Sequence, residues 1–172
     1  MSEPFNLLWL QAGSCGGCTM STLAADDVGL VRALERFNIR LLWHPSLSEE
    51  SGADALAILE GAADGRIRVD ALCVEGAILT GPNGTGRFQL LSGTGKPLAQ
   101  WVAAIAAHAR AVLAIGSCAA FGGVPTATSN PTDAVGLVYA GADSGGLLGT
   151  EFRSGAGLPV INVAGCAPIP AG

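Results

Sequence analysis

Apolar residues gather in five short runs, and most polar residues fall in the longer stretches between them. Each run is continuous in apolar character and does not alternate with polar positions. The runs are Asn6–Gln11, Ile39–His44, Ala71–Ala77, Ala111–Gly116 and Pro159–Ala164. Short continuous runs of this kind are typical of strands buried on both faces of a parallel sheet. We therefore expect five strands in one mainly parallel sheet.

The stretches between these runs carry apolar side chains at helical spacing. They predict helices over residues 21–37, 51–65, 97–110 and, as a short helix capped by Asn130, from Asn130 to Asp133. Pro97 falls in a first turn, where proline is tolerated. Strands that alternate with helices form βαβ units with right-handed crossovers. The pattern thus predicts an α/β fold, a flavodoxin-like three-layer domain that spans residues 1–172 as a single unit.

Composition adds two exclusions and one expectation. Hydrophobic residues make up 49% of the 172 residues and charged residues only 13%, whereas a typical soluble domain has about 25% charged residues. A surface this short of charge indicates that a partner covers part of it, or that the chain is a piece of something larger. The net charge of −5 excludes a basic face that binds nucleic acid. No apolar run reaches the roughly 18 residues that span a bilayer, so we expect no direct membrane insertion.

Two glycine-rich stretches, 81–95 and 136–157, are long for connections inside a compact domain. Loops of this length usually serve a function or contact a partner. The glycines of 81–86 have the spacing of a phosphate-binding loop, but Arg87 and Phe88 follow them in place of Lys and Ser or Thr. The glycines around Cys15 do not form GxGxxG either. The sequence therefore does not support nucleotide binding.

Four of the five cysteines follow predicted strands. Cys15 and Cys18 come after the first strand, Cys118 after the fourth and Cys166 after the fifth. Because the carboxyl ends of parallel strands meet at one edge of a sheet, we expect these four thiols to converge there. Four thiolates are the usual ligands of a [4Fe–4S] cluster. Cys73 differs, since it lies inside the third strand, and we expect a small buried thiol.

Two other interpretations of the cysteines stay open. A structural zinc site usually has two closely spaced pairs of ligands, and here Cys118 and Cys166 are far apart in the sequence. A thioredoxin-type redox pair would use Cys15 and Cys18 between a strand and a helix. That interpretation leaves the other two cysteines without a role. The iron–sulfur hypothesis accounts for all four.

The other polar residues have ordinary explanations. Glu75 ends an otherwise apolar strand, and a buried carboxylate there needs partners. We expect backbone N–H groups of loops near the cluster to supply them, in preference to a place on a proton path. His44 and His108 are expected to be surface or hydrogen-bonded histidines and not metal ligands. No Ser/His/Asp set indicates a hydrolase.

With these residues in hand, the chain resembles the small subunit of [NiFe] hydrogenases. The motifs that carry the resemblance are Leu8–Gln11 leading to Cys15–Ser21, then Cys73–Ala77, Gly116–Gly123 and Gly165–Pro168. The resemblance runs over essentially all 172 residues and covers the family's N-terminal domain. It implies that Cys15, Cys18, Cys118 and Cys166 bind the proximal [4Fe–4S] cluster, which faces the nickel–iron centre of a large subunit. H2 would react on that partner chain, and the isolated chain would be inactive.

A finer resemblance concerns the branch of this family. The stretches Trp43–Ser48 and Gly84–Phe88 look like the cytoplasmic hydrogen-sensing branch, which signals to a histidine kinase. Cytoplasmic uptake enzymes are the second choice, and a non-catalytic metal-binding or regulatory module derived from them is the third. The N-terminus has no basic region and no twin-arginine pair, so we expect a cytoplasmic protein.

The chain also departs from the family. Ser14 stands where many members have Glu, which removes one candidate for a proton relay. The family normally continues after the Cys166 motif with a domain that holds two more clusters, and none of it is present before Gly172. We therefore expect a fragment or a truncated gene product. The related subunit of complex I has adjacent cysteines where this chain has CxxC, and the spacing favours hydrogenase.

Overall fold

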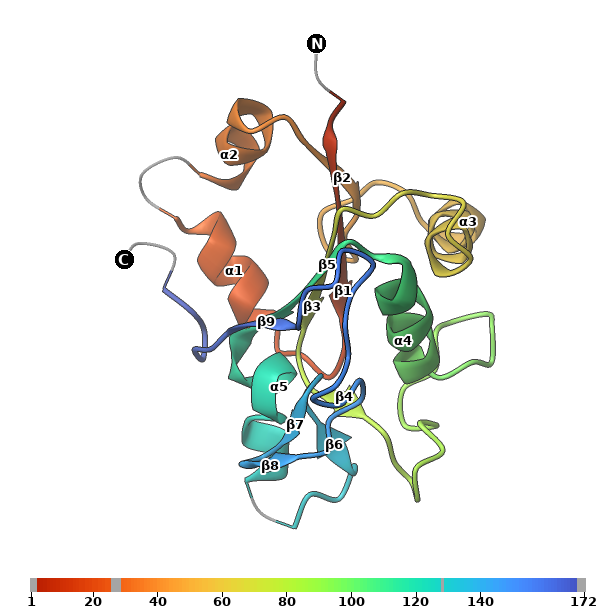
Figure 1. Ribbon diagram of the computed structural model, residues 1–172, viewed down its shortest axis with the longest axis vertical. Helices are drawn as coiled ribbons and strands as arrows, with labels where there is room; N and C mark the ends of the chain where they lie inside the picture. The colour runs from red at the N-terminus through yellow and green to blue at the C-terminus, as the bar shows by residue number, and fades with distance from the viewer. Residues whose placement is uncertain (1–2, 26–28, 128, 170–172) are drawn as a thin grey trace.

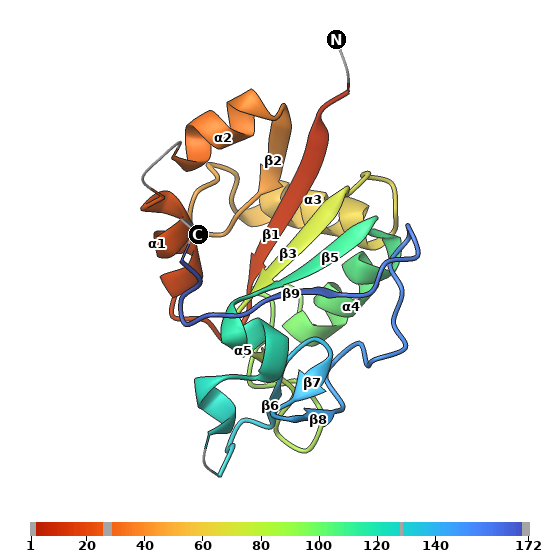
Figure 2. The ribbon, with the colours of Figure 1, turned by 60° about the vertical axis from the view of Figure 1, so that its left-hand side comes forward.

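A central five-stranded parallel sheet organises the computed structural model, which describes residues 3–25, 29–127 and 129–169 (Figures 1 and 2). Its strands are β1 (Phe5–Gln11), β2 (Ile39–Trp43), β3 (Ala71–Glu75), β5 (Ala111–Ile115) and β9 (Ile161–Val163). They lie in the order β2-β1-β3-β5-β9, and every neighbouring pair is parallel. This is the flavodoxin-like order. The predicted fold class and five strands are confirmed, although β3 and β9 are shorter than expected.

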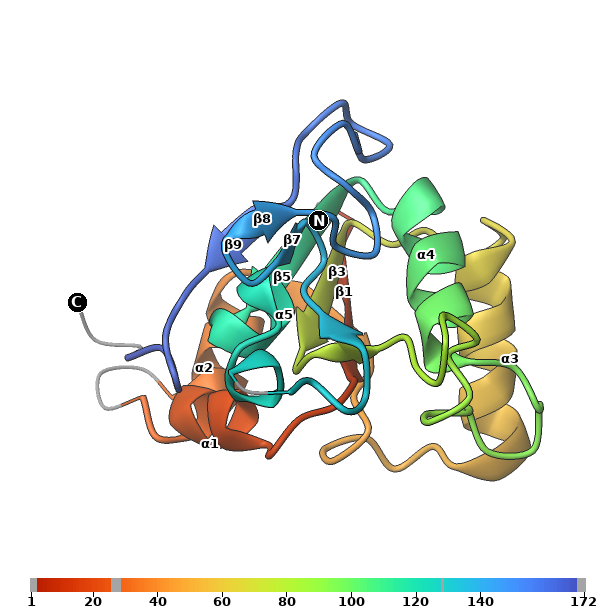
Figure 3. The ribbon, with the colours of Figure 1, turned by 90° about the horizontal axis from the view of Figure 1, so that it is seen from below.

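Helices flank the sheet on both sides (Figure 3). On one face lie α3 (Gly52–Ala63) and α4 (Leu98–His108), and on the other lie α1 (Gly17–Leu23) and α2 (Leu30–Arg36). A further short helix, α5 (Gly116–Phe121), follows β5 directly. The main core fills the space between the sheet and the α3–α4 layer, and its fully buried members include Leu8, Leu72, Val102 and Ile105. Helices therefore cover one face thoroughly and the other only in part.

The helix expected over residues 21–37 is wrong as a single element. The structure has two short helices there, and α1 begins at Gly17, four residues earlier than expected. Gly16 and Gly29 precede α1 and α2 with φ of 75° and 64°, angles that glycine adopts without strain. These two turns set where each helix starts.

The short helix expected from Asn130 is also wrong. Asn130 and Asp133 have φ of 45° and 48°, which a helix does not allow. The Asn130 side chain accepts a hydrogen bond from the amide of Ala134 at 2.7 Å and donates one to its carbonyl at 2.9 Å. Asparagine here closes a turn, as it often does. Pro97 likewise stands at the N-cap of α4 and not within its first turn.

Four very short strands, within the second glycine-rich stretch or just before one of the two stretches, form a small layer beyond the carboxyl end of the sheet (Figure 1). There β4 (Ile78–Leu79) pairs with β6 (Ala134–Val135), and β7 (Tyr139–Ala140) pairs with β8 (Asp143–Ser144), both antiparallel. A 3₁₀ turn at Val124–Thr126 connects α5 to this layer. None of the helices in the described residues is long and apolar enough to cross a membrane.

A buried carboxylate ties the amino ends of the central strands together. Asp70 precedes β3, is 2% exposed and accepts a hydrogen bond from the Asn6 amide at 3.0 Å. Arg68 lies 2.8 Å and Arg110 3.5 Å from its other oxygen. Burial raises the pKa of Asp70, but these hydrogen bonds and positive charges outweigh it and hold the pKa below its usual range. Asp70 is therefore an ionised structural residue.

The α1 side of the sheet leaves an open apolar groove of about 530 Å³. It runs over alternate residues of four strands, among them Trp9, Cys73, Leu113 and Val163. Ile161 and Val163 on the edge strand β9 are 44% and 37% exposed. A parallel sheet is normally covered on both faces, so this groove is apolar surface of the sheet that the α1 side leaves open.

Candidate metal centre

Three strands deliver the four cysteines to one end of the sheet. Cys15 lies in the loop after β1, Cys18 in the first turn of α1, Cys118 in α5 after β5, and Cys166 in the segment after β9. Because β1, β5 and β9 are parallel, all four lie at the carboxyl edge of the sheet. All are free thiols; Cys15 and Cys166 are exposed and the other two are half-buried. The thiols are thus in the neighbourhood that the sequence predicted.

Glycines lie directly against three of the thiols. A Cβ atom added to Gly116 would lie 2.5 Å from the sulfur of Cys18, and one added to Gly123 would lie 2.6 Å from that of Cys118. A Cβ atom on Gly17 would come within 3.2 Å of the Cys15 sulfur. Such distances leave no room for a side chain. The bare backbone around the sulfurs is therefore a geometric requirement of this site.

Burial, and electrostatic interactions with Glu75 and the other thiols, raise the pKa of Cys18. Burial raises the pKa of Cys18 to about 11, and the charge of Glu75 and those of Cys118, Cys15 and Cys166 add to the rise. Four thiolates cannot ionise together at this edge without positive charge between them. Metal ions supply that charge, and thiols release their protons when they bind metal. The donor set is thus chemically suited to a cationic metal centre.

The arrangement is not a ready-made site for one ion. Within the part of the chain that the structure describes, no three Cys, His, Asp or Glu side chains converge on a single metal position. A structural zinc ion holds each sulfur at about 2.3 Å, which forces its four ligands close together. The described residues therefore do not form a preassembled site for a single zinc ion.

Cys73 lies away from this group. It is buried in β3 beneath Trp9, and burial raises the pKa of its thiol to about 12. A thiol with this pKa stays protonated at neutral pH and behaves as a small apolar side chain. The expectation of a buried, unreactive cysteine is confirmed.

Behind the cysteines, Glu75 is the most densely hydrogen-bonded side chain described. It is fully buried at the end of β3. Its Oε1 accepts hydrogen bonds from the Ser14 hydroxyl at 2.9 Å and from the amides of Cys18 and Thr19 at 3.1 and 3.3 Å. Backbone amides near the cysteines do bind this carboxylate, as expected, but they belong to the first turn of α1 and not to a loop, and side chains supply the other hydrogen bonds. Glu75 thereby fixes the first turn of α1, which carries Cys18.

The second oxygen of Glu75 faces side chains. Oε2 accepts hydrogen bonds from the indole of Trp9 at 3.2 Å, the amide of Gln11 at 3.3 Å and the hydroxyl of Thr19. Burial raises the pKa of Glu75, but the hydrogen bonds from Thr19, Ser14 and Gln11 outweigh it, so its pKa lies below the usual range. Glu75 is therefore a buried negative charge held by dipoles alone.

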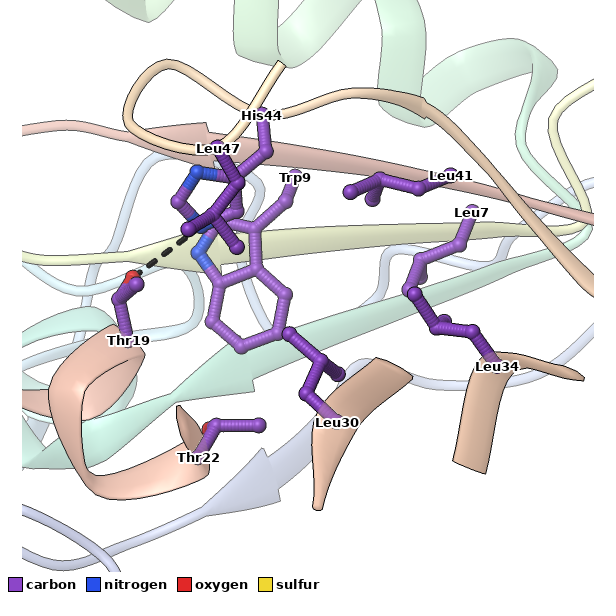
Figure 4. Close-up of a pocket in the computed structure, with 9 residues that line it drawn as sticks. All are labelled: Leu7, Trp9, Thr19, Thr22, Leu30, Leu34, Leu41, His44 and Leu47. Carbon is purple, nitrogen blue, oxygen red and sulfur yellow. Dashed lines mark hydrogen bonds between the residues drawn. The ribbon is translucent and has the colours of Figure 1, made fainter. Parts of the chain in front are cut away.

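Sequence reasoning missed the residues around this carboxylate. Thr19 and Gln11 were not singled out, Ser14 was noted only as the residue that replaces a family Glu, and His44 was expected to be an ordinary histidine. His44 is indeed hydrogen-bonded, but it is buried at the end of β2 and points to Thr19, 3.2 Å away (Figure 4). Gln11 could have been found from the sequence, because it is a polar residue at the end of the first apolar run, as Glu75 is near the end of the third. In the structure β1 and β3 pair in register, which places Gln11 opposite Glu75. His108, by contrast, is an exposed residue of α4, as expected.

These observations define a flavodoxin-like domain with four thiols gathered at the carboxyl edge of its sheet. The chain belongs to the family described as NADH ubiquinone oxidoreductase, 20 Kd subunit, whose model matches residues 15–172. The resemblance to hydrogenase small subunits, inferred from the motifs, is confirmed. Its placement in the hydrogen-sensing branch stays a prediction.

Relatives of this chain from three organisms are described as hydrogenases or hydrogenase small chains. The chain is 32% identical to the quinone-reactive Ni/Fe-hydrogenase small chain of Wolinella succinogenes, over 98% of this chain and 42% of the relative. It is 33% identical to the hydrogenase-2 small chain of Escherichia coli, over 95% and 39%. Among solved structures, an actinobacterial-type NiFe-hydrogenase from Ralstonia eutropha superposes with a TM-score of 0.81 at 29% identity, over 96% of this chain and 49% of that one. The chain thus spans less than half the length of these curated relatives.

Proposed function

We propose that this chain is the electron-transfer part of a [NiFe] hydrogenase small subunit and that Cys15, Cys18, Cys118 and Cys166 hold one [4Fe–4S] cluster. One observation carries the proposal: four free thiols from three parallel strands lie at one edge of a sheet, against glycines that leave their sulfurs unobstructed. The family membership supports it. A cluster bound there would take up and pass on single electrons.

The chain's own residues would prepare the site in three ways. Glu75 anchors the turn that carries Cys18, through two backbone amides. The glycines keep side chains away from the sulfurs. Ser117 accepts a hydrogen bond from the Gly165 amide at 3.1 Å, which joins the α5 and β9 segments and hence the last two ligands. Hydrogen bonds of this kind orient metal ligands and tune the metal.

The outer side of the site fits a protein partner. Cys15 and Cys166 are exposed, and so are the apolar side chains of Met20 (64%) and Ile169 (82%) beside them in sequence. Exposed apolar groups around a functional centre mark an interaction surface. We assign this surface to a large subunit that carries the nickel–iron site and reacts with H2, with electrons crossing it to the cluster.

The first experiment asks whether the cluster exists. The chain is purified anaerobically, and its iron and sulfide content and the EPR spectrum after reduction are measured. We expect about four irons per chain, and we expect Cys118→Ala to lose the four-iron signal. Cys73→Ala is the matched control, since its thiol is buried in β3, and it should keep the full cluster. A Cys118→Ala protein that retains four irons would refute the ligand set.

The second experiment asks for the partner. Co-expression with a [NiFe] large subunit, followed by capture on the small chain, should recover a complex in which H2 reduces the cluster. Recovery of the cluster-bearing chain without any H2-dependent reduction would favour the alternative, a metal-binding or regulatory module without catalysis.

Two finer assignments rest on the sequence resemblance alone. Hydrogen sensing with a histidine kinase as second partner, and a cytoplasmic location, derive from residues 43–48 and 84–88 and from the N-terminal sequence. The rate of continuous H2-dependent dye reduction would distinguish a sensor from an uptake enzyme. A sensor complex should reduce its cluster under H2 but support little continuous dye reduction. Fractionation of cells that express the full gene would locate the protein.

A further inference from the structure

A buried polar chain connects the end of β2 to the cysteine-bearing turn. His44, directly after β2, is 2% exposed, faces Thr19 and lies beside the ring of Trp9, with ring centroids 5.5 Å apart (Figure 4). The space beside this pair is walled by leucines, including Leu30, Leu41 and Leu47. Water has little access to such a pocket, so the polar groups must satisfy one another.

The hydrogen bonds determine which nitrogen of His44 carries the proton. The backbone amide of Ser46 donates to Nδ1 at 3.0 Å, and an amide N–H cannot accept a hydrogen bond. Nδ1 is therefore unprotonated, and the proton of the neutral ring sits on Nε2. Nε2 lies 3.2 Å from Oγ1 of Thr19, so His44 is the donor in that contact. Burial also lowers the pKa of His44, which keeps the ring neutral.

Gln11 is oriented equally firmly. Its Oε1 accepts a hydrogen bond from the Ser46 hydroxyl at 2.9 Å, which leaves its amide group to donate to Oγ1 of Thr19, also at 2.9 Å. The Thr19 oxygen thus accepts from both His44 and Gln11. A hydroxyl has two lone pairs and one proton, so the Thr19 proton must point to its remaining neighbour, Oε2 of Glu75.

We propose that His44 is a positioning residue for the metal centre: through Thr19 it directs a hydroxyl donor onto Glu75, the carboxylate that anchors the Cys18 turn. The inference rests on the proposed cluster. Each donor in the chain polarises the next, so His44 strengthens the hydrogen bond that disperses the charge of Glu75. This charge lies next to the cluster site, where hydrogen bonding and charge set a reduction potential.

Three substitutions at His44 separate the roles of its two nitrogens. His44→Asn can still accept from the Ser46 amide but no longer reaches Thr19. His44→Gln places an amide donor near the position of Nε2 and keeps the contact with Thr19. His44→Leu removes both functions and fills the space. His108→Gln, at an exposed histidine of α4, is the matched control.

The main readout is the ratio of reduced to oxidised cluster at a fixed potential, followed by EPR. Without the Nε2 donor the charge of Glu75 is less dispersed and reduction is harder. We expect the ratio to fall about twofold to fourfold in His44→Asn and His44→Leu, on the strength of a charge-assisted hydrogen bond and its cooperative part. His44→Gln and His108→Gln should stay close to wild type.

A second measurement does not depend on the cluster or on any variant. Nitrogen-15 NMR of the imidazole should show neutral His44 with the proton on Nε2. A proton on Nδ1, or a charged ring at pH 7, would overturn the proposal, as would equal potentials in wild type, His44→Asn and His44→Leu. Iron analysis of the wild type distinguishes failure of the His44 inference from failure of the proposed function. A wild-type chain without iron would refute the proposed cluster, and the inference about His44 with it.

Discussion

The substitution Glu75→Gln tests how a buried charge holds the cysteine-bearing turn. Glutamine has the same shape, but one of its two terminal groups donates and cannot accept. Glu75 receives hydrogen bonds at both oxygens, and three of its donors cannot reverse: the indole of Trp9 and the amides of Cys18 and Thr19. Whichever way the new amide points, at least one buried donor faces another donor.

The size of the effect follows from these bonds. One orphaned buried donor costs about 1–3 kcal/mol, and the remaining hydrogen bonds weaken because they lose a charged acceptor. An amide is less costly to bury than a carboxylate, which offsets part of the loss, so we expect a net destabilisation of about 2–4 kcal/mol. For a chain of this size that lowers the unfolding temperature by about 5–15 °C.

The assay is urea and thermal unfolding of the purified chain followed by circular dichroism. Glu60→Gln is the matched control, because Glu60 is exposed on α3 and should change stability by less than about 0.5 kcal/mol. The pKa of Glu75 is lowered by folding, so its stabilising contribution is present above the ordinary value of 4.5 and is lost as the pH falls through the folded value. The two proteins should therefore converge in acid. A Glu75→Gln protein as stable as wild type at pH 7 would refute this account.

Three further predictions concern other parts of the fold. Asp70→Asn should destabilise the chain by about 1–3 kcal/mol in urea unfolding, because an amide group then faces an arginine; the pKa of Asp70 is lowered by folding, so this difference should shrink as the pH falls below about 4. Gly116→Ala should abolish cluster assembly, since φ is 86° there and the new Cβ meets the sulfur of Cys18; a normal iron content would contradict the geometry. Replacing Ile161 and Val163 together by serine should lower the binding of a hydrophobic dye to the open groove by about half, with stability changed by less than about 1 kcal/mol, and unchanged dye binding would place the dye elsewhere.

The sheet and the neighbourhood of the cysteines could be predicted because each depends on a local pattern. Continuous apolar runs mark the strands of a buried parallel sheet, and the topology then brings Cys15, Cys118 and Cys166 to one edge. The bounds of the short helices α1, α2 and α5 could not be predicted from a local pattern. Five of the six residues of α5 (Gly116–Phe121) are small, so the segment carries no apolar periodicity, and its formation depends on contacts with β5 and β9.

The network behind the cysteines was out of reach for a different reason. His44 lies 31 positions before Glu75 and 25 after Thr19, and no spacing rule connects them. Its location also depends on a shift in register between β1 and β2, after which Leu8 pairs with Trp43. Such irregularities leave no periodic trace in a sequence. Only Glu75 was noticeable, as a charge at the end of an apolar strand.

The strand order has a consequence for biosynthesis. The proposed ligands are spread from the first strand to the last, and Cys166 follows β9, which pairs with β5 at the edge of the sheet. A nascent chain emerges from its N-terminus, so three of the thiols can fold into place while the fourth is still untranslated. At the proposed cluster site, iron delivery to all four thiols would therefore wait until β9 has docked. Any delay in that docking leaves Cys15, Cys18 and Cys118 as a partial site, open to mispairing or oxidation.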